Sequence, residues 1–425
     1  MKIWTKPRRL VAGPLGRLLA VALLTNTGRG VWVASFVLFY TRSIGLSPAQ
    51  VGVGALVAGV VGIGSTTPVG MIADRFGLRR SLLVLYLISA VAFLLYLGVS
   101  GFWSFVVVGC VAAVAGESSV GVRTALITAL TPDGERIAAL AKYRVVSQVG
   151  MAAGAGLGAL VIQVDSRPGY TAMLVGTALS YLAAALLVGR LPRAEGGRGR
   201  SGRHGAGRVL RDHRYLILAG LFGVLTFNWS MLSVGIPLWV AEHTDAPRWT
   251  SGVILVANTA AIALLQLRFS RPAETVPGAG RATVRSGLFL ALACAVFATT
   301  AGTSGVLTLV LLFVAGAIHI VGELLYVAGS WGVSVGLMPE DAQGEYQGAM
   351  AAGTASAQAL GPLLMTTFVV GWGSPGWLVL AGLFVLAGWA AFAVARSAWR
   401  RRAAEPAVPD ADPAVNAPGS PEATA

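Results

Sequence analysis

Five ionisable side chains lie inside long apolar stretches of this chain, where a charge is costly. They are Arg29, Glu117, Arg123, His319 and Glu323. A charged group in apolar surroundings usually pairs with an opposite charge or lines a polar cavity, and it is a candidate for a functional site. The sequence therefore predicts a buried polar site to which these residues contribute.

Three polar residues near the end of the chain share one helical face. His319, Glu323 and Tyr326 are spaced four and three residues apart, as neighbours on a helix surface are. A buried carboxyl group and an imidazole can both exchange protons near neutral pH. We therefore expect Glu323, His319 and Glu117 to be proton-coupling candidates. Glu323 comes first, because its half of the chain has no arginine at matching depth. The alternative is a pair of polar side chains hydrogen-bonded between helices.

The composition indicates a membrane protein. The chain has 425 residues, of which 55% are hydrophobic and 12% are charged, and its mean hydropathy is +0.72. A soluble domain has about 25% charged residues, so water-soluble, disordered and disulfide-rich secreted classes are excluded. Cys110 and Cys294 lie in separate apolar runs and the four histidines are scattered. We therefore expect no disulfide framework, no metal site and no cofactor.

The apolar stretches predict twelve membrane-spanning helices, each of about 20 residues or more. In chain order, these spans cover residues 18–40, 48–73, 81–99, 102–130, 141–164, 170–189, 215–240, 249–267, 286–301, 304–338, 346–370 and 376–395. The chain has 32 Lys and Arg residues, and nearly all of those outside the spans fall on one side, whereas Arg42, Arg167 and Arg248 fall on the other. The positive-inside rule then places both termini in the cytoplasm.

Arg29 on span 1 and Glu117 on span 4 lie at similar depths. At 1.5 Å per residue they are roughly 16 Å and roughly 20 Å from the inner ends of their spans. We expect a buried ion pair between them, which is either purely structural or is disrupted when substrate binds. Arg123 lies further inward, where it can meet an anionic group or reach the inner headgroups.

The chain divides into two related halves. Gly116-Glu117 on span 4 is matched by Gly322-Glu323 on span 10, and each precedes an acidic loop that begins with proline. The expected parts are a six-helix bundle at 1–189, a cytoplasmic linker at 190–214, a second six-helix bundle at 215–396 and a disordered tail at 397–425. The linker is rich in Arg and Gly but lacks aromatic residues that stack on bases. We therefore expect no nucleic-acid partner.

The connection between spans 2 and 3 carries a motif. Residues 70–80 read GMIADRFGLRR, which fits G-x-x-x-D-R-x-G followed by basic residues and resembles the signature loop of the major facilitator superfamily. The resemblance covers about 18–395 and implies an all-α integral membrane protein with twelve transmembrane helices in two pseudo-symmetric six-helix bundles. It also implies that this loop latches the halves together at the cytoplasmic side. The loop residues concerned are Gly70, Asp74, Arg75, Gly77, Arg79 and Arg80. The second half has no good copy of the loop.

In this family, spans 1, 4, 7 and 10 line a central cavity, and all five buried ionisable residues lie on spans 1, 4 or 10. The resemblance therefore implies these substrate-cavity candidates: Asn26, Arg29, Arg123, Asn228, Trp229 and Tyr326. The residues expected to serve helix packing are Gly150, Gly154, Gly158, Gly361 and Pro362. Asn258 and Gln266 on span 8 are expected to serve packing as well.

These observations predict a secondary transporter in the cytoplasmic membrane, surrounded by lipids and acting as a monomer. It would move a small molecule by alternating access, coupled to protons, and export a drug or metabolite. The alternatives are a proton-coupled importer, a non-transporting sensor and a membrane-embedded enzyme. We expect no enzyme, because no catalytic histidine cluster lies near a surface. Only Lys2, Lys6 and Lys142 are lysine among the basic residues, which indicates a GC-rich bacterial genome.

Overall fold

The computed structural model describes residues 13–39, 45–164, 166–192, 207–247 and 249–404, and the regular structure within these ranges is entirely helical. The first half contains α2 (Pro14–Leu38), α3 (Pro48–Phe76), α4 (Leu78–Leu95), α5 (Phe102–Ala129), α6 (Arg136–Val164) and α7 (Arg167–Gly189). The second half contains α9 (His213–Ser230), α10 (Ile236–His243), α11 (Trp249–Ser270), α12 (Val276–Thr299), α13 (Gly305–Leu337), α14 (Gln343–Met365) and α15 (Ser374–Ala404).

Shorter helical segments complete these elements. The 3₁₀ turns are η2 (Tyr96–Gly98), η5 (Arg271–Ala273) and η6 (Thr300–Gly302). Two segments are π-helical: η4 (Met231–Gly235) joins α9 to α10, and η7 (Thr366–Gly371) lengthens α14. Every one of the twelve predicted spans overlaps one long helix or one continuous helical run.

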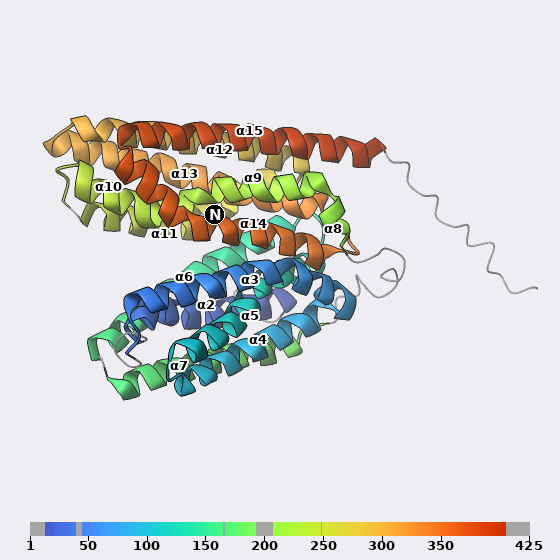
Figure 1. Ribbon diagram of the computed structural model, residues 1–425. Coiled ribbons are helices and arrows are strands. Elements are labelled where there is room, and N and C mark those ends of the chain that lie inside the picture. The colour runs from blue at the N-terminus through green and yellow to red at the C-terminus, as the bar shows by residue number, and fades with distance from the viewer. Residues whose placement is uncertain (1–12, 40–44, 165, 193–206, 248, 405–425) are drawn as a thin grey trace, which may run out of the picture.

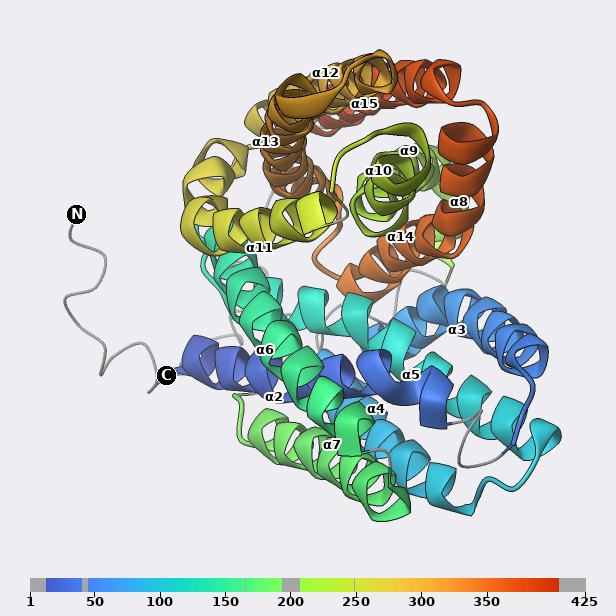
Figure 2. The ribbon, with the colours of Figure 1, turned by 90° about the vertical axis from the view of Figure 1, so that its left-hand side faces the viewer.

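Within the described residues, nine helices are long and apolar enough to cross a membrane. Three other long helices, α2, α6 and α14, contain 25, 29 and 23 residues. They carry more polar side chains, and they lie where the two halves of the molecule meet or next to that boundary (Figure 2).

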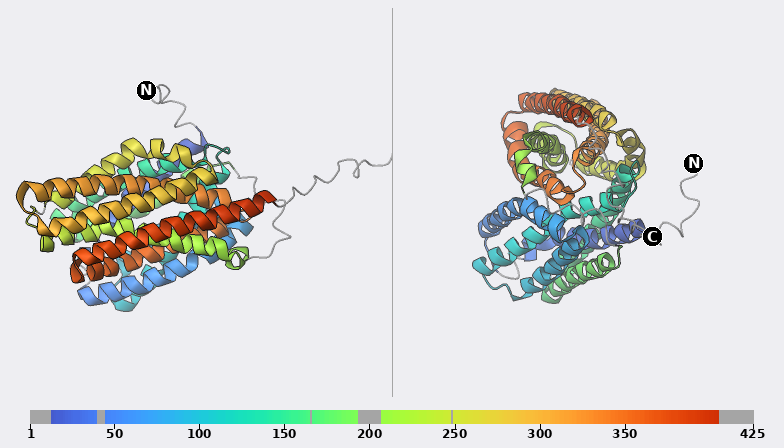
Figure 3. Two further views of the ribbon diagram at one scale, coloured as in Figure 1. Left: turned by 90° about the horizontal axis from the view of Figure 1, so that it is seen from above. Right: turned by 90° about the vertical axis from the view of Figure 1, so that its right-hand side faces the viewer.

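The two halves form separate bundles, one above the other in Figure 1. In the first half, α2 packs against α6 and α7, α3 against α5, and α4 against α7. The second half repeats the arrangement, with α9 against α14 and α15, α11 against α13, and α12 against α15. The long helices run roughly along one common direction (Figure 3). This arrangement confirms the predicted pair of pseudo-symmetric bundles.

Local sequence signals set several helix ends. Ser47 caps α3, accepting a hydrogen bond from the Gln50 backbone N–H at 3.2 Å, and Pro48 occupies the first turn, where a missing N–H is harmless. Gly77 separates α3 from α4 with φ of +98°. This conformation favours glycine because a Cβ would be strained there, and it allows the tight turn of the signature loop.

Glycines bring α2 and α6 into close contact. Gly150 and Gly154 both face α2, and a Cβ on Gly154 would overlap the Thr27 carbonyl oxygen. In the second half, Gly361 lies against Ser230 of α9 with no room for a Cβ, and Pro362 lies inside α14. Small residues of this kind let membrane helices approach closely.

The segment expected to be an unfolded linker is partly helical. Residues 193–206 lie outside the described ranges, but α8 (Arg208–Arg211) precedes α9. The backbone N–H of Val209 donates to the Glu345 carboxylate, and the Tyr346 hydroxyl donates to Asp212 at 3.0 Å. The structure therefore ties the end of the linker to the first turn of α14. At the other end of the second half, α15 continues to Ala404, beyond the predicted start of the tail at 397.

Candidate functional site

Glu323 lies at the centre of a cluster that joins the two halves. Its carboxylate forms an ion pair with Arg144 of α6. It also accepts hydrogen bonds from Trp229 Nε1 at 3.0 Å and from Asn258 Nδ2 at 2.5 Å. Glu323 is only 2% exposed, and the guanidinium of Arg144 lies 5.6 Å from the centre of the Trp229 ring. We call Arg144, Trp229, Asn258 and Glu323 the inter-half cluster.

Sequence reasoning missed Arg144 because it placed the start of span 5 at residue 141. In the structure α6 begins at Arg136, so Arg144 lies eight residues, or about 12 Å, into the helix. The acidic loop 132–135 just before α6 was a usable signal, because acidic residues favour helix N-termini.

The inter-half cluster corrects two expectations. The expectation that no fixed cation accompanies Glu323 is wrong, since Arg144 reaches it from the other half. Asn258, which was expected to serve helix packing, binds the same carboxylate. Gln266 donates to Ser270 at 3.2 Å and to the Leu324 carbonyl oxygen at 3.4 Å, as a residue in a helix interface would. Depth along a helix does not reveal a partner in the other half, which explains both errors.

The other residues on this face of α13 contact α9 separately. His319 is fully buried, and its Nε2 atom lies 3.0 Å from the Asn228 carbonyl oxygen. The Tyr326 hydroxyl lies 2.5 Å from the Thr226 hydroxyl. The Asn228 side chain donates to the Leu225 carbonyl oxygen at 2.6 Å. The predicted trio therefore shares one face, but each member binds a different group.

The first half contains a polar cavity of its own. It has a volume of about 310 Å³ and is lined by side chains of α2, α3, α4, η2, α5 and α7. Four predicted residues lie on its wall: Asn26, Arg29, Glu117 and Arg123. We call it the first-half cavity. Asn26 donates to the Ala22 carbonyl oxygen at 2.8 Å and to the Ser147 hydroxyl at 3.1 Å.

The structure does not pair Arg29 with Glu117. Both line the first-half cavity, but no ion pair joins them among the ion pairs of the described residues. The guanidinium of Arg123 instead lies 4.9 Å from the centre of the Tyr143 ring. Similar depth fixes only one coordinate and does not set the distance between two side chains.

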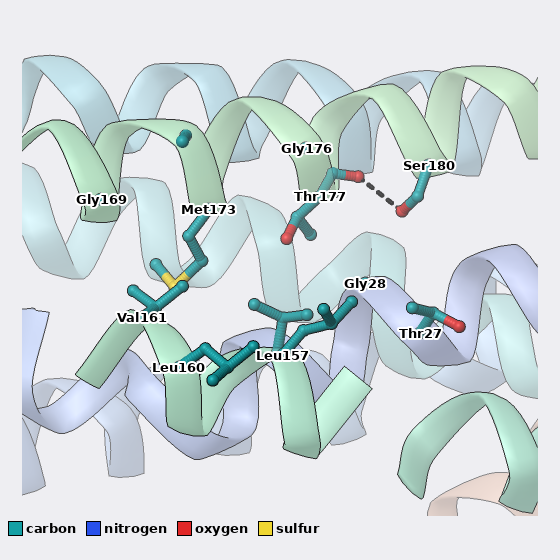
Figure 4. Close-up of a pocket in the computed structure, with 12 residues that line it drawn as sticks. Thr27, Gly28, Leu157, Leu160, Val161, Gly169, Met173, Gly176, Thr177 and Ser180 are labelled. Atoms are coloured by element: carbon teal, nitrogen blue, oxygen red, sulfur yellow. Dashed lines mark hydrogen bonds between the residues drawn. The ribbon is translucent and has the colours of Figure 1, made fainter. Parts of the chain in front are cut away.

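A second cavity is apolar. Its volume is about 460 Å³, and it lies between α2, α6 and α7 (Figure 4). Its polar side chains are the hydroxyls of Thr27, Thr177 and Ser180, and the Ser180 hydroxyl donates to the Thr177 carbonyl oxygen at 2.7 Å. No charged residue is among those that line it, so it is not the predicted polar site.

The signature loop binds the second half directly. The Asp74 carboxylate accepts hydrogen bonds from the backbone N–H groups of Gly344 at 2.6 Å and Glu345 at 2.7 Å, in the first turn of α14. A carboxylate is favourable at a helix N-terminus, where N–H groups lack partners. Gly70 makes the approach possible, since a Cβ there would overlap the Gly344 carbonyl oxygen.

The three arginines of the signature loop make different contacts. Arg79 donates to the carbonyl oxygens of Leu191 and Gly189, both at 2.8 Å, at the end of α7. Arg75 lies over the ring of its neighbour Phe76, 6.0 Å from its centre. Arg80 is exposed. Arg79 therefore fixes the loop to its own half, while Asp74 reaches across.

Glu274 makes the matching contact in the opposite direction. It lies between α11 and α12 and accepts hydrogen bonds from the backbone N–H groups of Ile137 at 3.3 Å and Ala138 at 3.0 Å, in the first turn of α6. Burial raises the pKa of Glu274, although these two hydrogen bonds act to lower it. The second half thus has a structural counterpart of Asp74, which the sequence did not reveal because the surrounding motif is absent.

The sequence places this chain in a known family. Residues 18–362 match the family model of the Major Facilitator Superfamily, and the chain belongs to that superfamily. It is therefore a multi-pass membrane transporter and not an enzyme.

Solved transporter structures share the fold. A bacterial homologue of the iron transporter ferroportin, in an outward-facing state, has a TM-score of 0.71 at 14% identity, over 91% of this chain and 100% of that one. The human organic anion transporter MFSD10 (TETRAN) has a TM-score of 0.66 at 15% identity, over 91% and 99%. The proton:xylose symporter XylE has a TM-score of 0.67 at 14% identity, over 88% and 94%.

Proposed function

We propose that this transporter exports a small molecule, a drug or a metabolite, in exchange for protons. The observation that carries the proposal is the buried ion pair between Arg144 and Glu323, which joins the two halves. In a transporter that works by alternating access, the halves rock against each other around a central site. A titratable contact between the halves can couple such rocking to protonation.

The two helix caps contributed by Asp74 and Glu274 indicate on which side of the membrane the transporter is closed. Both caps connect the halves at the end of the molecule where α8 lies (Figure 1). We infer that this end is cytoplasmic, because the positive-inside rule assigns the basic connections there to the cytoplasm. The conformation is then closed toward the cytoplasm and faces outward.

Protonation of Glu323 would weaken this closed state. A neutral Glu323 loses its ion pair and leaves Arg144 buried without a counter-charge. Breaking one side of a buried pair costs about 3–5 kcal/mol. Shifting a two-state equilibrium from 1:99 to 99:1 takes about 5.5 kcal/mol, so this single contact is large enough to bias the exchange between facing states.

Transport by membrane vesicles tests the function. Inside-out vesicles with a panel of labelled cationic, neutral and anionic compounds should accumulate at least one of them when a pH gradient is imposed. Glu323→Gln should abolish this accumulation and spare exchange of substrate without a gradient. Glu242→Gln, an exposed residue of α10, is the matched control. Full pH-driven accumulation by Glu323→Gln would disprove the coupling role.

The same experiment, repeated with right-side-out vesicles, decides the direction of transport. Uptake only by right-side-out vesicles would favour the alternative, a proton-coupled importer. We further propose that the protein works as a monomer in the cytoplasmic membrane of a GC-rich bacterium, with both termini inside the cell.

A further inference from the structure

The first-half cavity is separate from the inter-half cluster. All of its lining residues belong to the first half, and they include members of α4 and α7 on the side away from the second half. Along α5 the cavity extends from Phe105 to Arg123, which is about 27 Å. Its volume of about 310 Å³ matches the lower range of small-molecule sites, about 300 Å³.

The charges on this cavity do not balance. Arg29 and Arg123 contribute two positive charges and Glu117 one negative charge. None of the three takes part in an ion pair of the described residues. Glu117 can compensate one arginine, so one positive charge remains without a counter-charge in a membrane-embedded bundle. Such a charge is costly unless water, other polar groups or an anion surround it, and an anion compensates it most directly.

The surplus charge and a free hydrogen-bond donor meet at the inner end of the cavity. The Tyr86 side chain is fully buried and lines the cavity. Its hydroxyl lies beside the Arg123 guanidinium, which can donate a hydrogen bond to the phenol oxygen. The Tyr86 O–H itself meets no acceptor among the described residues, which is rare for a buried polar group. A guanidinium and a phenol that both donate fit an acceptor such as a carboxylate.

Aromatic rings line the cavity further out. Phe93 lies seven residues, or about 10 Å, along α4 from Tyr86. The Trp32 ring is 5.2 Å from the Phe93 ring and is stacked on the Tyr96 ring at 4.9 Å. An occupant would therefore meet donors at one end and an aromatic wall at the other.

We propose that the first-half cavity binds an organic anion with an aromatic or apolar body, its anionic group held by Arg123 and Tyr86. The cavity lies within the first half and not at the central site between the halves, so this inference does not depend on the proposed function. The binding site itself is a property of the purified protein.

Binding of three matched probes tests the site. The probes are 2-naphthoate, the neutral 2-naphthamide and the cationic 2-naphthylmethylammonium, measured by equilibrium dialysis on the full chain in phosphatidylcholine nanodiscs. The naphthoate should bind at least about tenfold more tightly than the amide, a difference of about 1.4 kcal/mol. The cation should bind more weakly than the amide. Equal binding of naphthoate and amide would overturn the proposal.

Variants assign the binding to the named residues. Arg123→Gln should weaken naphthoate binding at least about tenfold, and Tyr86→Phe should weaken it by a smaller factor while changing one atom only. Arg285→Gln, at an exposed arginine of α12, is the control and should bind as the native protein does. Should Arg123→Gln not fold, the Tyr86→Phe result decides. Unchanged affinity in the folded variants would contradict the proposal.

Lipid is the other possible source of an anionic group. Nanodiscs that contain phosphatidylglycerol should give the same naphthoate affinity if the site takes a free anion. Loss of binding in those nanodiscs would assign the cavity to a lipid headgroup and overturn the claim that it binds a free organic anion. Vesicle transport is scored separately: naphthoate binding without any proton-driven transport would disprove the proposed function and leave the anion site standing.

Discussion

Asp74 and Glu274 hold equivalent positions in the two halves, and each caps the first turn of a helix in the other half. Asp74 binds the backbone N–H groups that begin α14, and Glu274 binds those that begin α6. The two contacts are related by the pseudo-symmetry of the bundles. The halves are therefore fastened twice at the same end, once from each side.

Removing the charge of Asp74 should loosen this end. In Asp74→Asn the amide is a weaker acceptor for the N–H groups of α14, and a carboxylate at a helix N-terminus contributes about 0.3–2 kcal/mol. We expect slower transport with normal folding and membrane insertion. Transport rates of Asp74→Asn and of the exposed control Glu242→Gln give the comparison. Native turnover in Asp74→Asn would contradict a latching role.

Glu274 should make the closed state depend on pH. Because burial raises its pKa in this conformation, the closed state binds the proton more readily than a state in which Glu274 is exposed. Its contribution is therefore fully present below its ordinary pKa of about 4.5 and is lost as the pH rises through the raised value. Acidification on the side of the membrane where Glu274 lies should increase the population of the closed state, and Glu274→Gln should remove this dependence on pH.

Spin labels on exposed positions of the two halves can follow this change. Arg80→Cys on α4 and Arg281→Cys on α12, in a variant without Cys110 and Cys294, report the separation by double electron–electron resonance. A distance distribution that does not respond to pH, or that responds equally in Glu274→Gln, would show that Glu274 is not the sensor.

Arg144 and Glu323 should show a large interaction energy in a double-mutant cycle of protein stability. Arg144→Gln and Glu323→Gln each leave one buried charge alone, at a cost of about 3–5 kcal/mol, and the double variant should recover most of the loss. The cycle is measured as the free energy of unfolding in detergent of the native protein, the two single variants and the double variant. The pair of Arg136 with Asp133, which is 81% exposed on the aspartate side, is the control, with coupling of about 0.5 kcal/mol. Additive losses at Arg144 and Glu323 would mean that the pair is not formed.

Arg29 and Glu117 should behave in the opposite way. Because no ion pair joins them in the structure, the losses from Arg29→Gln and Glu117→Gln should add within about 0.5 kcal/mol. A double variant clearly more stable than this sum would show that the two charges meet directly, as their depths had suggested.

The sequence predicts the features that depend only on position along the chain. A charge inside an apolar stretch is visible without a structure, so Arg29, Glu117, Arg123 and Glu323 are found directly. The signature loop carries enough fixed positions to place Asp74 at the contact between the halves. The all-helical membrane fold and its two bundles follow from apolar lengths and the internal repeat.

What the sequence does not predict is which groups meet. The partner of Glu323 comes from α6, about 180 residues away in the chain, and only the packing of α6 and α11 brings Arg144 there. Glu274 lacks a motif, because capping a helix requires only a carboxylate in the right place. The absence of an ion pair between Arg29 and Glu117, among those of the described residues, likewise could not be predicted from their similar depths.

The attachment of α8 to α14 bears on how the chain can be divided. Val209 and Asp212 bind Glu345 and Tyr346, and the N–H groups bound by Asp74 belong to the same turn. If the halves are expressed as two fragments, a break upstream of Gly207 keeps α8 on the second fragment, whereas a break after Arg211 transfers it to the first. In the first kind of pair the contact of Val209 with Glu345 lies within one fragment, so the first turn of α14 is already held in place to meet Asp74; in the second kind this contact too has to form between separate molecules.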